Sequence, residues 1–424
     1  MTTLYTDALL TDAEGARHGW LLTDGSTILS VGTDADPLPQ ADEVTSLEGA
    51  RLCPGLTDSH VHFREPGLEY KATIASESRA ALAGGITSVF DMPNTVPATT
   101  TIEALEAKTA LGRAAAVTRY AAFFGATPGS LAEVLRLSKD LTPGIKIFLG
   151  TSTGAMAAPE ARELEDIFRA SVDLGLPIVV HAEDNAIIAA NTQAAVARYG
   201  SREAVPVDEH WRIRSEEACF RAAAEAVELA LRTGAHIHIA HISTAREARE
   251  LLTPGPTAGK QVTAETTPLY LDPVLADPAA RTNLHKINPA IKTPEDAAEL
   301  RCALFDGRID TIATDHAPHL RAEKDGGALT AASGAPSIQF AVPMMLTYLP
   351  GELVVAKMSK GVADVFGLEN YGLLRPGYRA DFTIIRDTFE HVISDADVLS
   401  PCGWTPFAGR EKSPRRPGGA ASNH

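Results

Sequence analysis

Short β-like runs alternate with alanine-rich helical stretches from residue 52 to about residue 345. This alternation is typical of βα units around a parallel sheet, and eight such units fit a closed (β/α)8 barrel better than an open sheet. The strands that we expect are residues 52–58, 86–91, 118–124, 144–149, 177–182, 236–242, 261–266 and 309–314. The expected helices between them include residues 71–83, 101–115, 158–174 and 215–233.

The two ends of the chain follow a different pattern. Residues 1–52 contain short alternating segments separated by Asp-Gly and Gly-Thr turns, which indicates small antiparallel strands. Strand character returns at residues 380–385, so both ends can contribute to one sheet. We expect an α/β fold with a small β domain from residues 1–52 and 372–408 and a barrel from residues 53–371. The polar, Pro/Gly-rich tail 409–424 is expected to be disordered.

Composition and charge exclude several classes of partner. The chain is 45% hydrophobic and 22% charged, which is typical of a globular protein. Its formal net charge of −16 argues against nucleic acid or an anionic membrane surface, so an anionic small molecule would need a local cationic pocket. The 4 cysteines form no CxxC pair, which argues against a cysteine zinc site. We find neither a signal-peptide pattern nor a membrane-length apolar run, and we expect a soluble cytoplasmic protein.

A pattern typical of a metal site follows the first predicted strand. His60 and His62 are two residues apart on an extended segment, where alternate side chains point to the same side. Both imidazoles can therefore reach one metal ion. Arg64 adds a planar anion-binding group two residues further along. This arrangement predicts an anionic substrate held next to a metal-activated water.

Further candidate ligands fall in or after later predicted strands. Active sites of (β/α)8 barrels are built at the C-terminal ends of the strands. The residues at these positions are Lys146 in the fourth strand, His181 at the end of the fifth, His241 at the end of the sixth and Asp315 after the eighth. Imidazole and carboxylate ligands that leave a position open for water are typical of zinc.

The sixth strand offers three histidines, and its alternation separates them. His236 and His238 fall on one face of the strand and His241 falls on the other. Because His241 stands at the strand end, we predict that it is the ligand. We expect His236 and His238 to be hydrogen-bonded packing residues between the barrel and the helices.

Lys146 has two interpretations. As an ammonium it would repel metal cations. As a carbamate formed with carbon dioxide it becomes a bidentate anion that can bridge two of them. The alternative is a buried lysine paired with a carboxylate, and the residue taken alone favours that alternative.

Several segments resemble the dihydroorotases of the amidohydrolase superfamily, and together they span nearly the whole chain. The metal histidines are shared across that superfamily. The runs His-Phe-Arg-Glu-Pro-Gly at 62–67 and Asp-His-Ala-Pro-His at 315–319 are more specific. The matching segments are residues 54–67, 91–95, 181–183, 241–244, 286–289 and 313–319.

The resemblance implies a binuclear centre of two divalent metal ions, with zinc as the expected metal. One ion would be bound by His60, His62 and Asp315, the second by His181 and His241, with Lys146 bridging them as its carbamate. The implied ligands of the substrate carboxylate are Arg64, Asn94 and His319. The implied contacts to the substrate ring come from Asn288 and the backbone at Ser333 and Gly334.

The implied activity is the reversible hydrolytic ring opening of (S)-dihydroorotate to N-carbamoyl-L-aspartate in de novo pyrimidine biosynthesis. Asp315 would take the proton from the attacking water and pass it to the departing ring nitrogen. The alternatives are an allantoinase, a hydantoinase or another cyclic amidohydrolase, and a catalytically inactive scaffold. Arg64 and His319 argue against a hydantoinase, whose neutral ring carries no carboxylate. An inactive scaffold would be expected to have lost several ligands together.

The expected partners are a small anionic substrate and further copies of the same chain in a homo-oligomer. An association with aspartate transcarbamoylase stays open, because an active barrel can also dock onto that enzyme. Neither nucleic acid nor a membrane is an expected partner.

Overall fold

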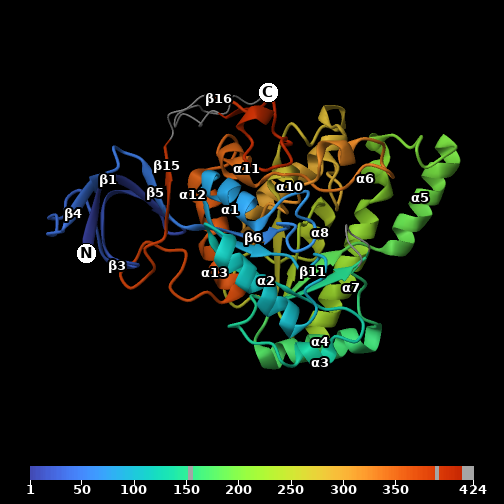
Figure 1. The fold of residues 1–424 in the computed structure, drawn as a ribbon, viewed down its shortest axis with the longest axis horizontal. Coiled ribbons are helices and arrows are strands. Elements are labelled where there is room, and N and C mark those ends of the chain that lie inside the picture. The colour runs from blue at the N-terminus through green and yellow to red at the C-terminus, as the bar shows by residue number, and fades with distance from the viewer. Residues whose placement is uncertain (151–155, 387–390, 413–424) are drawn as a thin grey trace.

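The computed structural model describes residues 1–150, 156–386 and 391–412, and its centre is a ring of parallel strands (Figure 1). One part of the ring consists, in spatial order, of β6 (Leu56–Val61), β7 (Ile86–Asp91) and β8 (Arg119–Ala122). The other part consists of β9 (Phe124–Gly125), β10 (Ile145–Leu149), β11 (Ile178–Ala182), β12 (Ile237–Ile239), β13 (Val262–Thr266) and β14 (Thr311–Ile312).

Two junctions close the ring. Phe123 alone separates β8 from β9, so these two strands together make up the third predicted strand. At the other junction Val61 and His316 form a parallel bridge, and the N–H of His62 donates to the carbonyl of His316 at 2.8 Å. The predicted (β/α)8 barrel is confirmed, and the contact that closes it is one that strand spacing could not reveal.

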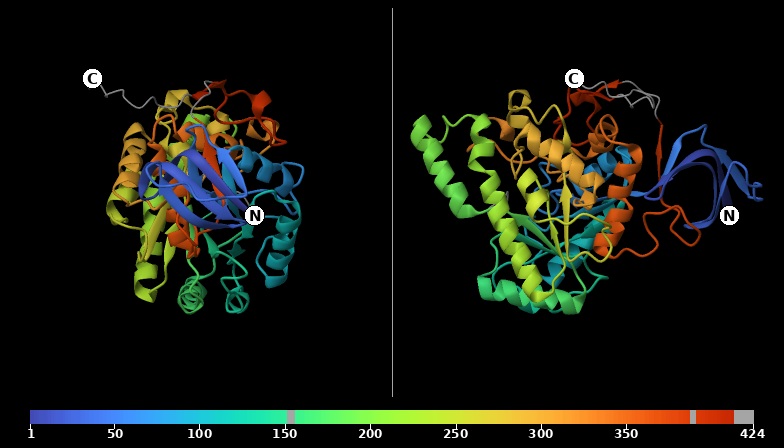
Figure 2. Two further views of the ribbon diagram at one scale, coloured as in Figure 1. Left: turned by 90° about the vertical axis from the view of Figure 1, so that its left-hand side faces the viewer. Right: turned by 180° about the vertical axis from the view of Figure 1, so that it is seen from behind.

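Helices surround the ring (Figure 2); most connect consecutive strands, and the last three follow β14. The longer ones are α1 (Ile74–Ala83), α2 (Ile102–Ala115), α4 (Ala161–Leu174), α5 (Asn185–Tyr199), α7 (Glu216–Thr233), α10 (Pro294–Phe305), α11 (Ile338–Met345) and α12 (Gly351–Met358). The shorter ones are α3 (Leu131–Val134), α6 (His210–Ile213), α8 (Ala245–Glu250), α9 (Pro268–Leu271) and α13 (Lys360–Phe366). Among the helices described, none combines the length and the apolar character needed to cross a membrane.

Polar caps and glycines determine where the helices begin and end. The hydroxyl groups of Thr73 and Ser215 accept N–H groups of the first turns of α1 and α7. Because Thr73 caps α1, the helix predicted over 71–83 begins only after this residue. Helices α4 and α7 end at Gly175 and Gly234, which adopt the left-handed conformation that glycine tolerates best.

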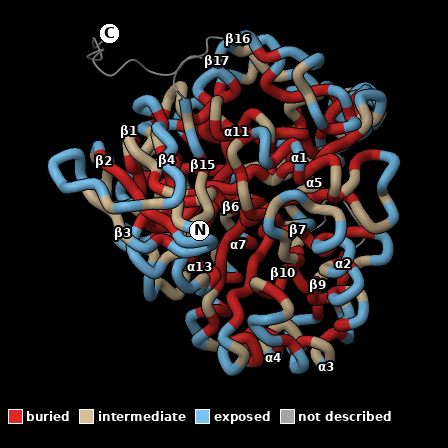
Figure 3. Tube along the Cα trace, turned by 60° about the vertical axis from the view of Figure 1, so that its left-hand side comes forward, coloured by how far each residue is buried: buried red, intermediate tan, exposed pale blue. Residues whose placement is uncertain are grey.

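Alternation along the barrel strands separates an outer core from the inside of the ring. Ile237 and Ile239 of β12 belong to the main hydrophobic cluster, together with residues of α7 such as Leu229. The intervening positions of the strands hold buried polar side chains, among them Lys146 and His181. Figure 3 shows buried residues along the central strands and exposed residues at the outer edges of the molecule.

Strands from both ends of the chain share a second sheet, as predicted. Its spatial order is β15 (Phe382–Ile385), β5 (Arg51–Pro54), β1 (Thr2–Asp12), β2 (Gly15–Asp24) and β3 (Thr27–Thr33), and β4 (Glu43–Ser46) pairs with β1. Strand β15 is antiparallel to β5, with Phe382 opposite Pro54. This sheet lies to one side of the barrel (Figure 1). The exact residue ranges of the two domains stay a prediction.

The tail that was expected to be disordered begins with ordered residues. Glu411–Lys412 forms β17, which pairs antiparallel with β16 (His391–Val392). This pairing gives the start of the tail a backbone partner that its Pro/Gly-rich composition did not indicate. Residues 413–424 lie outside the described residues.

A buried ion pair joins helix α2 to β7, the strand next to the one that carries His60. The ammonium of Lys108 is 3.0 Å from Asp91 Oδ2, and both side chains are at most 1% exposed. The same carboxylate accepts the Tyr120 hydroxyl at 2.7 Å and the backbone N–H of Phe63 at 3.0 Å. Asp91 therefore fixes the backbone immediately after His62.

Replacing Lys108 by methionine should lower the free energy of unfolding by about 3–5 kcal/mol, because Asp91 would stay buried without its cation. Urea unfolding of the purified protein measures this change. Arg169→Ala is the control, since it removes an exposed ion pair with Glu165 and should change the free energy by less than about 1 kcal/mol. Equal effects of the two variants would contradict the importance of the buried pair.

Candidate metal centre and substrate cavity

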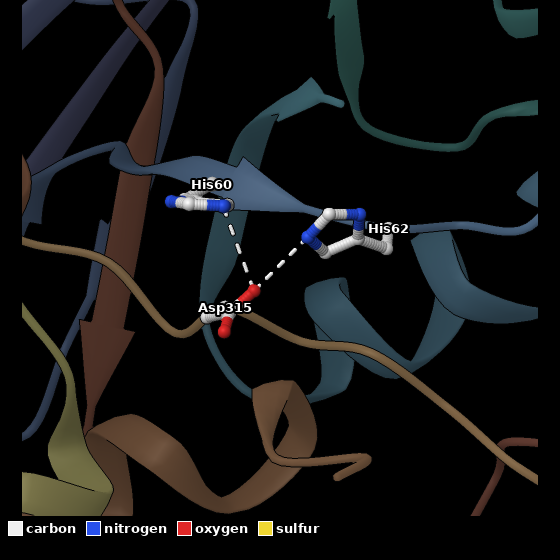
Figure 4. A group of neighbouring side chains, drawn as sticks. All are labelled: His60, His62 and Asp315. Carbon is white, nitrogen blue, oxygen red and sulfur yellow. Dashed lines mark hydrogen bonds and ion pairs between the residues drawn. The ribbon is translucent and has the colours of Figure 1, made fainter. Parts of the chain in front are cut away.

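Three predicted ligands converge where the barrel closes. His60 lies on β6, His62 follows that strand, and Asp315 follows β14. The Oδ1 atom of Asp315 is 3.0 Å from His62 Nε2 and 3.5 Å from His60 Nε2 (Figure 4). One ligand atom from each residue lies within 4.8 Å of the others. Two imidazoles and a carboxylate at these separations form a donor set that fits a divalent ion such as zinc.

Unusual backbone conformations turn side chains toward this centre. Arg64, His241 and Asp315 have positive φ angles of 71°, 41° and 48°. For residues other than glycine such conformations cost about 1–3 kcal/mol each and persist only where the surroundings enforce them. Their concentration among the predicted site residues indicates that the backbone is held in place for function.

A second pair of histidines lies beside the first group. His181 Nδ1 is 2.9 Å from His241 Nε2, and the ring centroid of His241 is 5.3 Å from that of His60. Burial lowers the pKa of His241 well below its usual value and that of His62 to about 4. These imidazoles are therefore neutral at pH 7, which is the form that binds metals.

Lys146 points into the ring without a hydrogen-bond partner among the described residues. Its Nζ atom lies 5.1 Å from the centroid of the Phe148 ring. Burial lowers the pKa of Lys146 to about 8, against the opposing attraction of Glu265 and Asp315. A buried amine that is partly neutral and unpaired fits the carbamate better than it fits the alternative of a lysine paired with a carboxylate. The carbamate itself stays a prediction.

Polar residues behind the histidines orient the rings. His60 Nδ1 contacts a carboxylate oxygen of Glu265, a residue of β13, and His62 Nδ1 is 2.7 Å from Asn94 Oδ1. His181 Nε2 is 3.0 Å from Glu183. When these nitrogens donate to oxygen, the opposite ring nitrogens keep their lone pairs for a metal. Asn94, predicted as a substrate ligand, thus also contacts a candidate metal ligand.

Glu265 was not identified from the sequence as a site residue. It is 1% exposed and alternates with Ala264, which belongs to the main hydrophobic cluster, so its side chain points to the inside of the ring. A glutamate within a strand that is otherwise largely buried is the signal that could have revealed it.

The structure corrects the expected location of two histidines on strand six. His238 contacts Glu265 at 3.4 Å and Thr263 at 3.0 Å, and His236 contacts the same threonine at 2.9 Å. These contacts lie on the face opposite Ile237 and Ile239, inside the ring, where the His238 ring also packs against Phe366 of α13 at a centroid distance of 5.6 Å. Strict alternation would send His241 to the outer face, but the strand ends at Ile239 and the positive φ angle of His241 turns its ring inward.

A small cavity with polar residues in its lining opens next to the three converging ligands. Its lining includes five of the predicted substrate contacts and consists of His62, Arg64, Asn94, Asn288, Asp315, Ala317, Ser333 and Gly334. Arg64 donates from Nε to the carbonyl of Pro318 at 2.9 Å, whereas its buried Nη2 has no partner within the described residues. Burial lowers the pKa of Arg64 to about 10, so it stays cationic at pH 7.

His319 lies beside the cavity and is not among the residues that line it. Its Nε2 is 3.1 Å from the carbonyl oxygen of Ser333, and its Nδ1 is 3.1 Å from the ammonium of Lys71. Burial, with Arg64 and Lys71 nearby, lowers the pKa of His319 to about 2. Both nitrogens of this neutral ring are therefore engaged, and in this structure His319 contacts the cavity backbone through Ser333.

Comparison with known proteins places the chain in a family. The model of the amidohydrolase family matches residues 51–402. The chain belongs to the amidohydrolase family. Members of this family are typically metal-dependent, in agreement with the group formed by His60, His62 and Asp315.

Individual members of the amidohydrolase family resemble the chain over most of its length. A dihydroorotase of Halobacterium salinarum is 35% identical over 408 residues, which cover 95% of this chain and 91% of that protein. A dihydroorotase of Brevibacillus brevis is 34% identical and covers 85% and 84% of the two chains. Among solved structures, the L-hydantoinase (dihydropyrimidinase) from Arthrobacter aurescens has a TM-score of 0.89 at 25% identity, covering 97% and 93%.

Replacing Glu265 by glutamine should weaken zinc binding by about 10- to 100-fold, because His60 loses the carboxylate that fixes its ring. Competition with a chromophoric chelator measures the affinity. Asp310→Asn is the control: Asp310 is also buried and accepts the N–H of Ala264, but it lies before β14, away from the histidines. Unchanged zinc affinity in the Glu265 variant would remove this residue from the centre.

Proposed function

We propose that the chain is a dihydroorotase, which catalyses the reversible hydrolytic ring opening of dihydroorotate to N-carbamoyl-L-aspartate. The observation that carries the proposal is the buried, unpartnered guanidinium nitrogen of Arg64 in a cavity that Asp315 and His62 also line. A buried guanidinium N–H group without a hydrogen-bond acceptor is unfavourable, so the cavity is suited to a substrate that carries a carboxylate. The dihydroorotases that the chain resembles at 34–35% identity support the same substrate.

Two divalent ions, with zinc as the proposed metal, would occupy the centre. His60, His62 and Asp315 would bind one ion, and His181 and His241 would bind the other. The unpartnered amine of Lys146, as its carbamate, would bridge the pair. When bound, the metals supply Lewis acidity, which polarises the amide carbonyl and makes water nucleophilic near neutral pH.

The residues of the chain would then bind, orient and move a proton. Arg64 donates to the substrate carboxylate, and the amide of Asn94 beside His62 faces the same cavity. The buried Oδ1 of Asn288, which has no partner in the part of the chain that the structure describes, can accept an N–H of the ring. The Asp315 carboxylate takes the proton of the attacking water and gives it to the departing ring nitrogen. The synthetic direction reverses these transfers.

The structure also bears on the alternatives. The similarity to an L-hydantoinase reflects the shared barrel, but a neutral hydantoin ring would leave Arg64 buried beside the substrate without an anion. An inactive scaffold is disfavoured because His60, His62 and Asp315 converge and His181 and His241 are in contact. Turnover of dihydroorotate, allantoin and hydantoin by the same preparation distinguishes the enzymes. The homo-oligomer, the association with aspartate transcarbamoylase and the cytoplasmic location stay predictions.

Replacing Asp315 by alanine should reduce the rate of dihydroorotate ring opening by about 100- to 10,000-fold, because the group that carries the proton is lost. A spectrophotometric ring-opening assay measures turnover, and metal analysis of the same samples should show at least one metal partly retained. Undiminished turnover would remove Asp315 from the mechanism. Loss of turnover together with all metal would show that this carboxylate acts only by holding the centre together.

Replacing Arg64 by methionine should lower kcat/KM for dihydroorotate by about 30-fold or more, since a buried charged contact contributes about 2–5 kcal/mol. The loss should appear mainly as a higher KM. Any residual turnover of the uncharged dihydrouracil ring, which has no carboxylate, should not fall in parallel. Equal losses on both rings would show that Arg64 supports the fold of the site and not carboxylate recognition.

A further inference from the structure

Lys324 is a buried cation whose hydrogen bonds all go to the main chain. It is the last residue of the short helix η4 (Arg321–Lys324) and is 1% exposed. Its ammonium donates to the carbonyl oxygens of Lys286 at 2.9 Å, Ala332 at 2.7 Å and Gly334 at 2.8 Å. An ammonium has three N–H bonds, so these three carbonyls satisfy its donors completely.

The three carbonyls belong to two segments that form walls of the substrate cavity. Lys286 lies two residues before Asn288, and Ala332 and Gly334 flank Ser333. The N–H of Gly334 also donates to the carbonyl of Lys286 at 2.9 Å, so the two segments meet at the point that Lys324 contacts. One side chain therefore holds the backbone of both segments at their junction.

Gly334 shows how little room this junction leaves. Its φ angle is 134°, and an added Cβ would lie 2.8 Å from the carbonyl oxygen of Ala317 and 3.0 Å from the ring of His319. Trp404 packs on the other side: its ring centroid is 5.7 Å from the Lys324 ammonium, and its indole N–H donates to the carbonyl of His319 at 2.8 Å. The backbone around Gly334 is therefore confined by Ala317 and His319 and is hydrogen-bonded to Lys324.

Cations outnumber anions around this junction. Arg64, Lys71 and Lys286 are each at most 8% exposed, and Glu323 forms an ion pair with Lys71 at 2.8 Å. Burial, then Lys286 and Arg64, lower the pKa of Lys324 to about 7, against the attraction of Glu323. An anion bound in the cavity would relieve this crowding of positive charge.

We infer that Lys324 is a positioning residue of the proposed dihydroorotase reaction. Its ammonium holds the backbone around Asn288 and Ser333 in the arrangement that binds the substrate, and its charge favours an anionic ligand. The inference rests on the proposed function, but it assigns a role to a side chain that does not line the cavity. It also explains why a lysine is buried where no carboxylate takes its hydrogen bonds.

The charge of Lys324 gives the inference a pH signature. As the pH rises through its pKa the ammonium becomes an amine, which has only two N–H donors for three carbonyls. The charged groups that face it are Arg64 and Lys286 from neighbouring loops and Glu323 on its own helix, while His319 is neutral over this range. Burial lowers the pKa of Lys286 to about 8, so this lysine also loses charge over the range, and the Lys324 variant shows which part of the dependence belongs to Lys324. The KM for dihydroorotate should therefore rise between about pH 7 and pH 9, and substrate should shift the midpoint upward.

The test compares Lys324→Met with Lys357→Met in the full-length protein. Lys357 is the control, because it is a partly buried lysine that donates to a carbonyl, that of Ile309 at 2.6 Å, away from the cavity. In Lys324→Met the KM should rise about 10-fold or more, as expected for loss of charged hydrogen bonds, with a smaller change in kcat. Its KM should lose the pH dependence described above. Lys357→Met should keep both KM and kcat within about twofold of the wild-type values.

Two further measurements keep the inference falsifiable. Lys324→Gln retains two N–H donors without the charge and replaces the methionine variant if that variant does not fold. Backbone amide hydrogen exchange should be faster at residues 286–290 and 331–336 in either Lys324 variant and unchanged in Lys357→Met. This measurement does not depend on which substrate the protein turns over. A wild-type protein that opens no dihydroorotate refutes the proposed function, and exchange alone then decides whether Lys324 positions these segments. Unchanged KM and unchanged exchange would overturn the inference.

Discussion

The meeting of the first barrel strand with the chain that follows the eighth is the contact on which the rest of the structure depends. The bridge between Val61 and His316 closes the ring, and Thr314 donates from its backbone and hydroxyl to Asp58 at 3.0 and 2.5 Å. The same contact brings His60 and His62 against a carboxylate that is distant in sequence. Closure of the barrel and assembly of the metal centre therefore depend on the same contact.

Around this junction the molecule separates two kinds of polar environment. The metal side collects imidazoles that burial keeps neutral, with carboxylates such as Glu265 behind them. The substrate side collects cations, including Arg64 and Lys324, whose hydrogen bonds go largely to main-chain carbonyls. The first surface favours metal cations and the second favours an anionic substrate. Because the two surfaces are neighbours, they set the orientation of a bound ring before the reaction begins.

Much of the fold could be predicted from the sequence because it depends on local periodicity. The strand predicted over 86–91 matches β7, and helix 101–115 differs from α2 by one residue. Alternation held at His238 but failed at His241, because the left-handed conformation of His241 turns its side chain to the inside of the ring. The contact that closes the barrel could not be predicted, since it pairs segments that are more than 250 residues apart in the chain.

The candidate site shows the same division. His60, His62 and Asp315 could be recognised because metal ligands have a distinctive chemistry and spacing. Glu265 and Lys324 could not, because their roles depend on burial and on carbonyl groups of other segments, which leave no pattern in the sequence. His319 was recognised by its motif, but the motif does not reveal that Lys71 and Ser333 occupy its ring nitrogens.

The pairing of β15 with β5 has a consequence for biosynthesis. Strand β5 precedes the first barrel strand directly, yet one of its two neighbours in the sheet is Phe382–Ile385, which is synthesised only after all the barrel strands. While the ribosome is still producing the barrel, β5 forms an unprotected edge of the N-terminal sheet, and such edges recruit strands from other molecules. A nascent chain that stalls before residue 382 would carry a nearly finished barrel and an open edge, the form of this molecule most in need of a chaperone.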